Sequence, residues 1–222
     1  MKKILLLFSF VFLSICGFAQ SVSFGVRGGI TLANNQIRAA SPDYHPNTSP
    51  ITTFSVGGFA DVTRGDFSLE PGIFFSGQGG ESKTSPGSYQ TGYWLSDSKE
   101  RLWYIEIPID IIYHLPGLFK NVYVGAGPYI ATGISGNESI IVSEVFPNNP
   151  AQNTRTTVDY KVFGAEGYRR FQLGANAITG VRFKNHWLIN IGYDLGLTSI
   201  TNPGEANIKD SQFTLSLGYA FK

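Results

Sequence analysis

Apolar residues alternate with small or polar residues along several long stretches of the chain. Alternation of this length is the signature of a β-strand with one apolar face. Five segments show it clearly, with Phe74 as an exception in the second: 22–32, 67–75, 103–113, 187–197 and 213–221. Three more alternate less regularly and bring the predicted strands to eight: 52–62, 122–132 and 170–183.

The connections between these predicted strands fall into two classes. Three are short turns: 63–66, 114–120 and 184–186. Four are long and polar: 33–50, 77–100, 133–169 and 199–211. The repeated alternation predicts an all-β fold, and short turns at one end with long loops at the other are typical of an outer-membrane barrel. We expect an eight-stranded antiparallel up-and-down transmembrane β-barrel with periplasmic turns and extracellular loops. The segment 156–163 could extend the sixth strand, 170–183, above the membrane.

The position of the apolar face decides between a membrane barrel and a soluble one. Soluble eight-stranded barrels hold apolar side chains inside and present polar ones to water. Here the face opposite the apolar one is rich in Gly, Ser, Thr and Asn with few charges, which suits a crowded interior better than a solvated surface. We therefore predict that the apolar face contacts lipid.

Aromatic residues mark both ends of the predicted apolar faces. Where one strand carries two, they are eight to twelve residues apart. In a tilted strand this spacing is on the order of 20–30 Å, which matches the apolar band between two aromatic girdles. The girdle at the short turns is predicted to contain Phe67, Tyr113, Phe183, Trp187 and Phe221. The girdle at the long loops is predicted to contain Phe54, Phe75, Trp103, Phe171 and Phe213.

The same assignment directs six charged side chains into the lumen. An eight-stranded barrel is only wide enough to be filled by side chains, so we expect these charges to pair with each other. The alternative is a narrow ion path or proton relay. The predicted lumenal charge network consists of Arg27, Glu70, Glu106, Asp110, Arg182 and Asp194.

The N-terminal segment 1–19 has the features of a cleaved secretory signal peptide. Lys2 and Lys3 precede an apolar stretch, and the segment ends with the small residues of a cleavage site around Phe18. We predict cleavage after Ala19, which leaves 20–222 as the barrel domain.

The single cysteine of the chain, Cys16, lies inside this leader. The alternative reading is therefore a lipoprotein anchor at Cys16. Such anchors normally have a small residue before the cysteine, and Ile15 is large. If the leader is removed, no cysteine remains, and we expect neither disulfides nor thiol chemistry.

The overall composition resembles that of a soluble protein, with 42% hydrophobic residues, 15% charged residues and a mean hydropathy of −0.01. Alternation explains this average as the sum of two unlike faces. The 17 Lys and Arg residues nearly balance the 16 Asp and Glu residues, so we expect no nucleic-acid partner.

The three histidines limit the enzymatic chemistry that the sequence supports. A hydrolytic site at the outer rim needs a base, and of His45, His114 and His186 only His45 lies in a predicted outer loop. Its context, Pro42-Asp43-Tyr44-His45-Pro46, is typical of a turn. We expect a protein that is not an enzyme, with no cofactor and no transition-metal site. A lipid-modifying enzyme is the weaker alternative.

Short motifs recur along the predicted strands: Gly25-Val26-Arg27-Gly28-Gly29-Ile30, Phe67-Ser68-Leu69-Glu70-Pro71-Gly72, Tyr104-Ile105-Glu106-Ile107-Pro108, Gly125-Ala126-Gly127-Pro128-Tyr129 and Tyr193-Asp194-Leu195-Gly196-Leu197. With these motifs the mature chain resembles the PorT-like outer-membrane β-barrel family. Thr31 departs from the pattern, since such proteins often have asparagine after the double glycine. The end of the chain resembles the assembly signal of such barrels through Gly218, Tyr219 and Phe221, although Lys222 follows.

The resemblance implies a bacterial outer-membrane location, contact with outer-membrane lipid and insertion by the barrel assembly machinery. It implies little about activity, because members of the family look alike while their roles differ. We expect a structural or surface-interaction role through the long loops, with an envelope or extracellular protein as the possible partner. The alternatives are a narrow channel and a subunit of a secretion or envelope complex.

Overall fold

The computed structural model describes residues 21–38, 47–84, 93–163, 167–202 and 206–221. The predicted signal peptide, His45 and Lys222 lie outside these ranges. Among the described elements, no helix combines the length and apolarity needed to cross a membrane. The elements are β1 (Ser21–Arg38), β2 (Asn47–Ser49), β3 (Ile51–Arg64), β4 (Phe67–Thr84), β5 (Tyr93–His114), η1 (Gly117–Phe119), β6 (Val122–Val145), η2 (Pro150–Gln152), β7 (Thr154–Lys161), β8 (Phe171–Arg182), β9 (Trp187–Gly196) and β10 (Asn207–Phe221).

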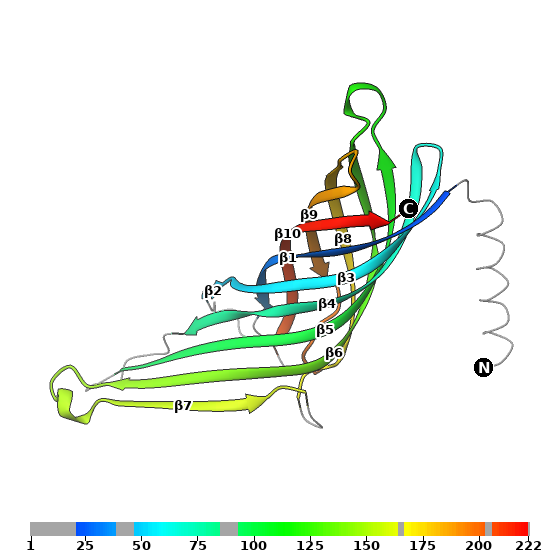
Figure 1. The fold of residues 1–222 in the computed structure, drawn as a ribbon. Coiled ribbons are helices and arrows are strands. Elements are labelled where there is room, and N and C mark those ends of the chain that lie inside the picture. The colour runs from blue at the N-terminus through cyan, green and yellow to red at the C-terminus, as the bar shows by residue number, and fades with distance from the viewer. Residues whose placement is uncertain (1–20, 39–46, 85–92, 164–166, 203–205, 222) are drawn as a thin grey trace, which may run out of the picture.

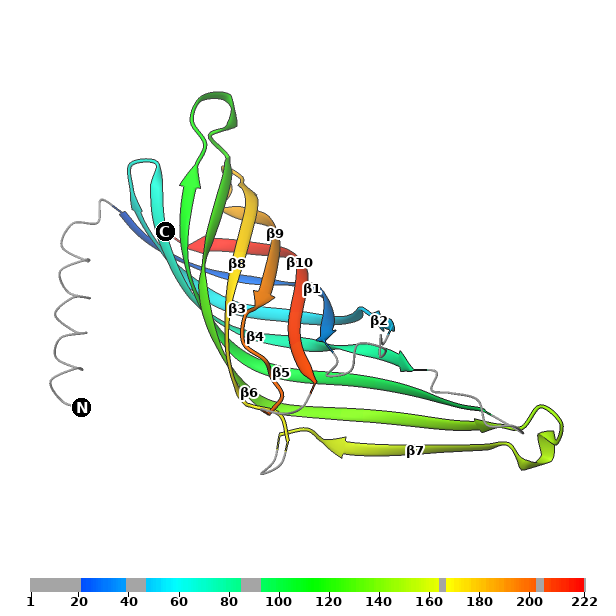
Figure 2. The same cartoon turned by 180° about the vertical axis from the view of Figure 1, so that it is seen from behind.

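Eight of the strands form a closed antiparallel ring, which Figures 1 and 2 show from opposite sides. The order around the ring is β1, β3, β4, β5, β6, β8, β9 and β10. The first and last of these strands close it, with pairs running from Phe24↔Phe221 to Arg38↔Asn207. The predicted eight-stranded up-and-down barrel is therefore confirmed.

The remaining strands, β2 and β7, lie outside the ring and lengthen its wall. β2 pairs with the end of β4, and β7 pairs with the end of β6. The segment 156–163, predicted as a possible extension of the sixth strand, falls largely in β7. This is a separate strand, but it pairs with β6 beyond the end of β8 and so continues along β6 the ladder that β8 forms.

The segments predicted as long polar loops contain much more strand than expected. β4 continues to Thr84, β5 begins at Tyr93 and β6 continues to Val145. Their backbones go on pairing well beyond the predicted apolar band. Alternation fades there because neither face needs to contact lipid, so the sequence pattern reads as loop although the ladder persists.

The two faces of the ring differ as the alternation predicted. Outward side chains such as Ile30 (63% exposed) and Ile111 (61% exposed) are apolar, whereas inward Thr31 and Asp110 are almost completely buried. A belt of exposed large apolar side chains is unfavourable in water and favourable in a bilayer. Phe74, which broke the pattern, is buried inside the ring.

Apolar clusters fill the lumen at both ends of the barrel. The lower cluster, at the short-turn end, consists of Phe59, Phe74, Ile112, Tyr123, Ile178, Leu188 and Ala220. The upper cluster, at the long-loop end, consists of Leu102, Tyr104, Tyr129, Ala131, Val162, Ile200 and Ile208. Glycines on the inner wall make room for the large rings. A Cβ at Gly25, for example, would lie 2.3 Å from the Phe59 ring.

Candidate functional site

An ion pair lies between β1 and β4 inside the ring. The Arg27 guanidinium donates to the Glu70 carboxylate at 3.1 Å, and the two side chains are 9% and 3% exposed. Arg27 also lies 5.1 Å from the ring centre of Phe59 and 5.0 Å from that of Phe74. The Arg27 guanidinium thus lies against two aromatic rings of the lower cluster, and the Glu70 carboxylate balances its charge.

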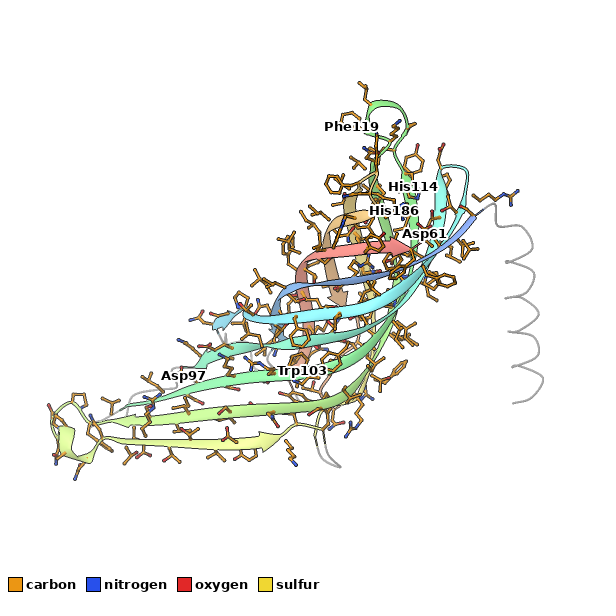
Figure 3. All side chains as sticks on the ribbon, in the orientation of Figure 1. Asp61, Asp97, Trp103, His114, Phe119 and His186 are labelled. Carbon is orange, nitrogen blue, oxygen red and sulfur yellow. The ribbon has the colours of Figure 1, made fainter. Side chains whose placement is uncertain are left out.

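The second lumenal arginine has a partner that the sequence analysis missed. Arg182 forms a short ion pair with Asp61, which is 1% exposed. Asp61 also accepts a hydrogen bond from Thr63 at 2.9 Å. Figure 3 shows Asp61 at the short-turn end of the barrel, the end at which His114 and His186 also lie. Asp61 was missed because it lies at the end of an irregular strand, although its place on the inward face follows from the pairing.

The other predicted lumenal carboxylates have amide partners. Glu106 accepts a hydrogen bond from Gln212 at 3.2 Å, and Asp110 accepts one from Asn176 at 3.1 Å. Within the described residues, one ion pair joins two of the six predicted lumenal charges, and that pair is Arg27–Glu70. The expectation that the six charges pair with each other was too simple, because neutral amides on the inner wall also satisfy buried carboxylates.

A small cavity lies between the two apolar clusters. Its volume is about 60 Å³, and its lining includes Arg27, Glu106, Asp194 and Thr214. This volume is enough for a few water molecules. The cavity is thus a polar layer of the interior, with the side chains of the two apolar clusters on either side of it.

A polar cap lies above the upper cluster. Glu100 accepts hydrogen bonds from the Tyr168 hydroxyl at 2.5 Å and from the Asn35 side chain at 2.7 Å. Glu100 lies three positions beyond Trp103 of the predicted outer girdle, so this carboxyl lies outside the membrane-spanning part of β5. The pKa of Glu100 is raised to about 7. Burial is the main cause and the negative charge of Glu138 adds to it, while the two hydrogen bonds lower the pKa in part.

Asp210 on β10 occupies an equivalent position beyond Phe213. It accepts a hydrogen bond from Gln172 at 3.1 Å and is 2% exposed. Burial raises the pKa of Asp210 to about 7, with a further contribution from the charge on Glu100. Sequence analysis missed both carboxyls because it assigned them to loops. The inward alternation of 98, 100 and 102 was the signal that could have found Glu100.

A comparison with known protein families identifies the family to which this barrel belongs. The model described as "Outer membrane protein beta-barrel domain" matches residues 18–202. The chain belongs to this family. The barrel therefore lies in the bacterial outer membrane, as the sequence predicted. No curated protein matches the chain.

Solved structures similar to this family member are outer-membrane barrels with little sequence identity. The attachment invasion locus protein Ail of Yersinia pestis has 10% identity and a TM-score of 0.42, and the match covers 91% of this chain and 100% of Ail. Neisserial surface protein A has 13% identity and a TM-score of 0.41, with 91% and 100% covered. The outer membrane protease OmpT of Escherichia coli has 9% identity and a TM-score of 0.37, with 92% and 98% covered.

The barrel places the ten predicted girdle aromatics on its outer wall. Several of them contact each other: the Phe75 and Trp103 rings stack at 5.0 Å, and the Phe67 and Tyr113 rings lie 5.0 Å apart. The Tyr219 and Phe221 rings of the predicted assembly signal lie 5.4 Å apart. The roles of these residues as girdle and signal stay predictions.

A serine–histidine contact occurs at the short-turn end of the barrel, where no catalytic pair was predicted. The Ser68 hydroxyl lies 2.8 Å from His114 Nε2 and 2.9 Å from the Thr63 hydroxyl. Ser68 is 4% exposed, so its oxygen is not presented to a substrate. The contact instead links Asp61 and Thr63 to His114 in one hydrogen-bonded network. No group of three or more His, Cys, Asp or Glu side chains suited to a metal ion occurs among the described residues.

Proposed function

We propose that this outer-membrane barrel is a non-enzymatic surface-interaction protein. Its contact surface is the outer sheet, which we define as β2, residues 77–84 of β4, 93–101 of β5, 136–145 of β6, and β7. The observation that supports this is the continuation of paired strands far beyond the outer girdle, on the side away from the C-terminus in Figures 1 and 2.

The free edge of the outer sheet is its most favourable docking element. β7 pairs with β6 on one side, and no described strand pairs with its other side. All eight residues of β7 are exposed, including Val158 at 37% and Tyr160 at 52%. An exposed edge strand offers unpaired backbone groups to an extended segment of a partner. The proposed partner is an extracellular protein.

A second candidate function is membership of an envelope complex through the periplasmic end. The turn between β5 and β6 carries Leu118, which is 99% exposed, and Phe119, which is 62% exposed. Two neighbouring apolar side chains at the tip of a turn favour contact with another molecule.

A narrow channel is the weaker alternative. The polar cavity with Arg27, Glu106 and Asp194 supports it, but the apolar clusters above and below favour a closed lumen. A planar bilayer recording with the purified protein tests it. We expect no conductance above the bare bilayer, and steady single-channel steps would replace the surface-interaction proposal.

Site-specific photo-crosslinking in intact cells separates the two interaction functions. A crosslinking amino acid replaces Val158 on β7 in one variant and Phe119 at the periplasmic tip in another. The surface-interaction function predicts a discrete adduct from position 158 and none from position 119. An adduct from position 119 alone would favour the envelope complex, and no adduct from either position would contradict both.

A further inference from the structure

The partner of β6 changes at the outer edge of the membrane. β6 pairs with β8 through Thr132 and with β7 from Asn137 onward. Between these points its register against β5 also shifts, opposite Trp103 and Tyr104. We call residues 133–136 the strand fork, because β6 changes its neighbour from β8 to β7 along these residues.

Arg170 holds the strand fork together. Its guanidinium donates to the Gly133 carbonyl at 2.9 Å and to the Phe163 carbonyl at 3.4 Å. The Gly133 N–H donates in return to the Arg170 carbonyl at 2.7 Å. The guanidinium also lies 5.2 Å from the centre of the Phe163 ring. The strand fork is thus a fixed structure whose backbone groups have partners.

A cavity of about 250 Å³ opens at the strand fork. Two cations reach it, and a hydroxyl and a side-chain amide add hydrogen-bond donors. Its lining residues are Ile134, Ser135, Gly136, Asn137, Lys161, Phe163 and Arg170.

A third cation stands beside the cavity. Arg101 is the register partner of Asn137, and Lys161 is the partner of Asn137 on its other side. Directly opposed residues on one face of a sheet have Cβ atoms about 5 Å apart, so the three side chains form a row. Arg101 and Lys161 are exposed, and neither forms an ion pair within the described part of the chain.

Carboxylates near this row do not neutralise it. On the same face, Glu81 and Asp159 stand one row further out, together with Lys99. Asp159 accepts a hydrogen bond from Ser139 at 2.5 Å. Glu138 lies on the opposite face of the sheet. The cavity rim therefore keeps an excess of positive charge.

The height of the cavity relates it to the membrane. Arg101 is two residues beyond Trp103 of the predicted outer girdle. Ile134 in the strand fork is 47% exposed, and Phe171 next to it is 55% exposed. Apolar side chains below and cations above match the boundary between lipid tails and headgroups.

We propose that the strand fork binds the phosphate-bearing headgroup of an outer-leaflet lipid. Arg170 and Arg101 supply planar guanidinium groups that suit a phosphate, and Lys161 adds a flexible charge from the opposite side. The exposed side chains of Ile134 and Phe171 offer apolar contact to the acyl chains of the same molecule. This favours a lipid over a soluble phosphate, which would use the cations alone.

Quenching of Trp103 fluorescence tests the proposal. Trp94→Phe and Trp187→Phe leave Trp103 as the one tryptophan of the full chain. The protein is reconstituted in phosphatidylcholine vesicles that contain brominated phosphatidic acid or, separately, brominated phosphatidylcholine. We expect phosphatidic acid to associate beside Trp103 at least about fivefold more strongly than phosphatidylcholine, because each basic residue near the surface contributes to anionic lipid binding.

Two double variants, each of which removes two positive charges, test whether the strand fork causes the preference for phosphatidic acid. Arg101→Gln with Lys161→Gln is expected to abolish the preference, to a ratio of about one between the two lipids, since two cations of the site are removed. Lys120→Gln with Lys184→Gln, at the periplasmic turns, is expected to keep it. Both are exposed positions, and heat-dependent gel migration verifies that each variant is folded. Equal quenching by the two lipids, or equal losses in the two double variants, would overturn the proposal.

Soluble anions distinguish the source of the phosphate. Millimolar inorganic phosphate or glycerol 3-phosphate is added at constant ionic strength, with sodium chloride as the reference. The lipid assignment predicts that the preference for phosphatidic acid persists. Its complete loss at these concentrations would assign the strand fork to a soluble phosphate and contradict the lipid headgroup.

Discussion

The Arg27 guanidinium lies 3.1 Å from the Glu70 carboxylate inside the barrel, where neither side chain is more than 9% exposed. Arg27 belongs to β1 and Glu70 to β4, which are separated by β3 in the ring. The contact therefore spans the lumen beside β3 and ties two non-adjacent strands together. Removing one partner would leave a buried charge without compensation.

Arg27→Met should destabilise the barrel strongly. The expected loss is about 3–5 kcal/mol of unfolding free energy, because Glu70 would remain buried without its cation. Urea unfolding in lipid vesicles, followed by tryptophan fluorescence, measures it. Arg64→Met at the exposed end of β3 serves as the control, with an expected change within about 0.5 kcal/mol. The double variant Arg27→Met with Glu70→Met should recover part of the loss. Equal effects of Arg27→Met and Arg64→Met would refute the role of the pair.

The adjacent glycines Gly28 and Gly29 should differ sharply in their tolerance of alanine. A Cβ at Gly29 would lie 2.2 Å from the Leu215 carbonyl oxygen, at the seam where β1 and β10 close the ring. A Cβ at Gly28 would meet its nearest atom at 3.6 Å, which is ordinary contact. Gly29→Ala should cost about 1–3 kcal/mol and slow folding into vesicles, while Gly28→Ala should be nearly neutral. The folded fraction on an unheated gel measures both, and a reversed order would contradict the register of the seam.

The polar cap that contains Glu100 and Asp210 should become less stable as the pH rises. Glu100 and Asp210 have pKa values raised to about 7 in the folded protein, against ordinary values of 4.5 and 3.8. Groups with a raised folded pKa bind protons more tightly in the folded state, so their stabilising contribution is complete below about pH 4 and is lost as the pH passes through about 7.

Hydrogen exchange at the Tyr168 amide, which donates to the Val162 carbonyl at 2.7 Å, reports this loosening. Its protection, corrected for intrinsic exchange, should fall between pH 5 and 8 on the order of tenfold. Glu100→Gln removes one of the two titrating groups and should flatten the dependence. Protection that increases with pH would show that the cap carboxyls are ionised in the folded state.

The sequence predicted the barrel well because lipid imposes a simple rule on each strand. Ile109 and Ile111 must face outward and Asp110 inward, and this alternation appears directly in the residues. The same rule directed the ten predicted girdle aromatics outward and six charges inward. It fails for Asp61, whose neighbours on β3 include glycines and alanine that leave the two faces alike in composition.

The outer sheet could not be predicted by the same reasoning. Beyond Trp103 neither face has to contact lipid tails, so residues such as Ser96, Asp97 and Ser98 give no pattern although their backbones stay paired. The partners of Glu100 come from β1 and from the stretch before β8, and contacts between segments so distant in sequence follow from the closed ring and not from any local signal.

The central claim is an outer-membrane barrel with its outer sheet outside the cell and its short turns in the periplasm. Single-cysteine labelling tests it most directly, since the sequence holds one cysteine, Cys16, inside the predicted leader. Asp97→Cys marks the outer sheet, and Phe119→Cys marks a periplasmic turn. Figure 3 shows these two positions at opposite ends of the molecule.

Intact cells are treated with a membrane-impermeant maleimide, and the same cells are treated after the outer membrane has been permeabilised. The account predicts that position 97 reacts in intact cells, whereas position 119 reacts only after permeabilisation. Labelling of position 119 but not 97 in intact cells would invert the topology. Equal labelling of both positions in the soluble fraction would contradict the membrane barrel itself.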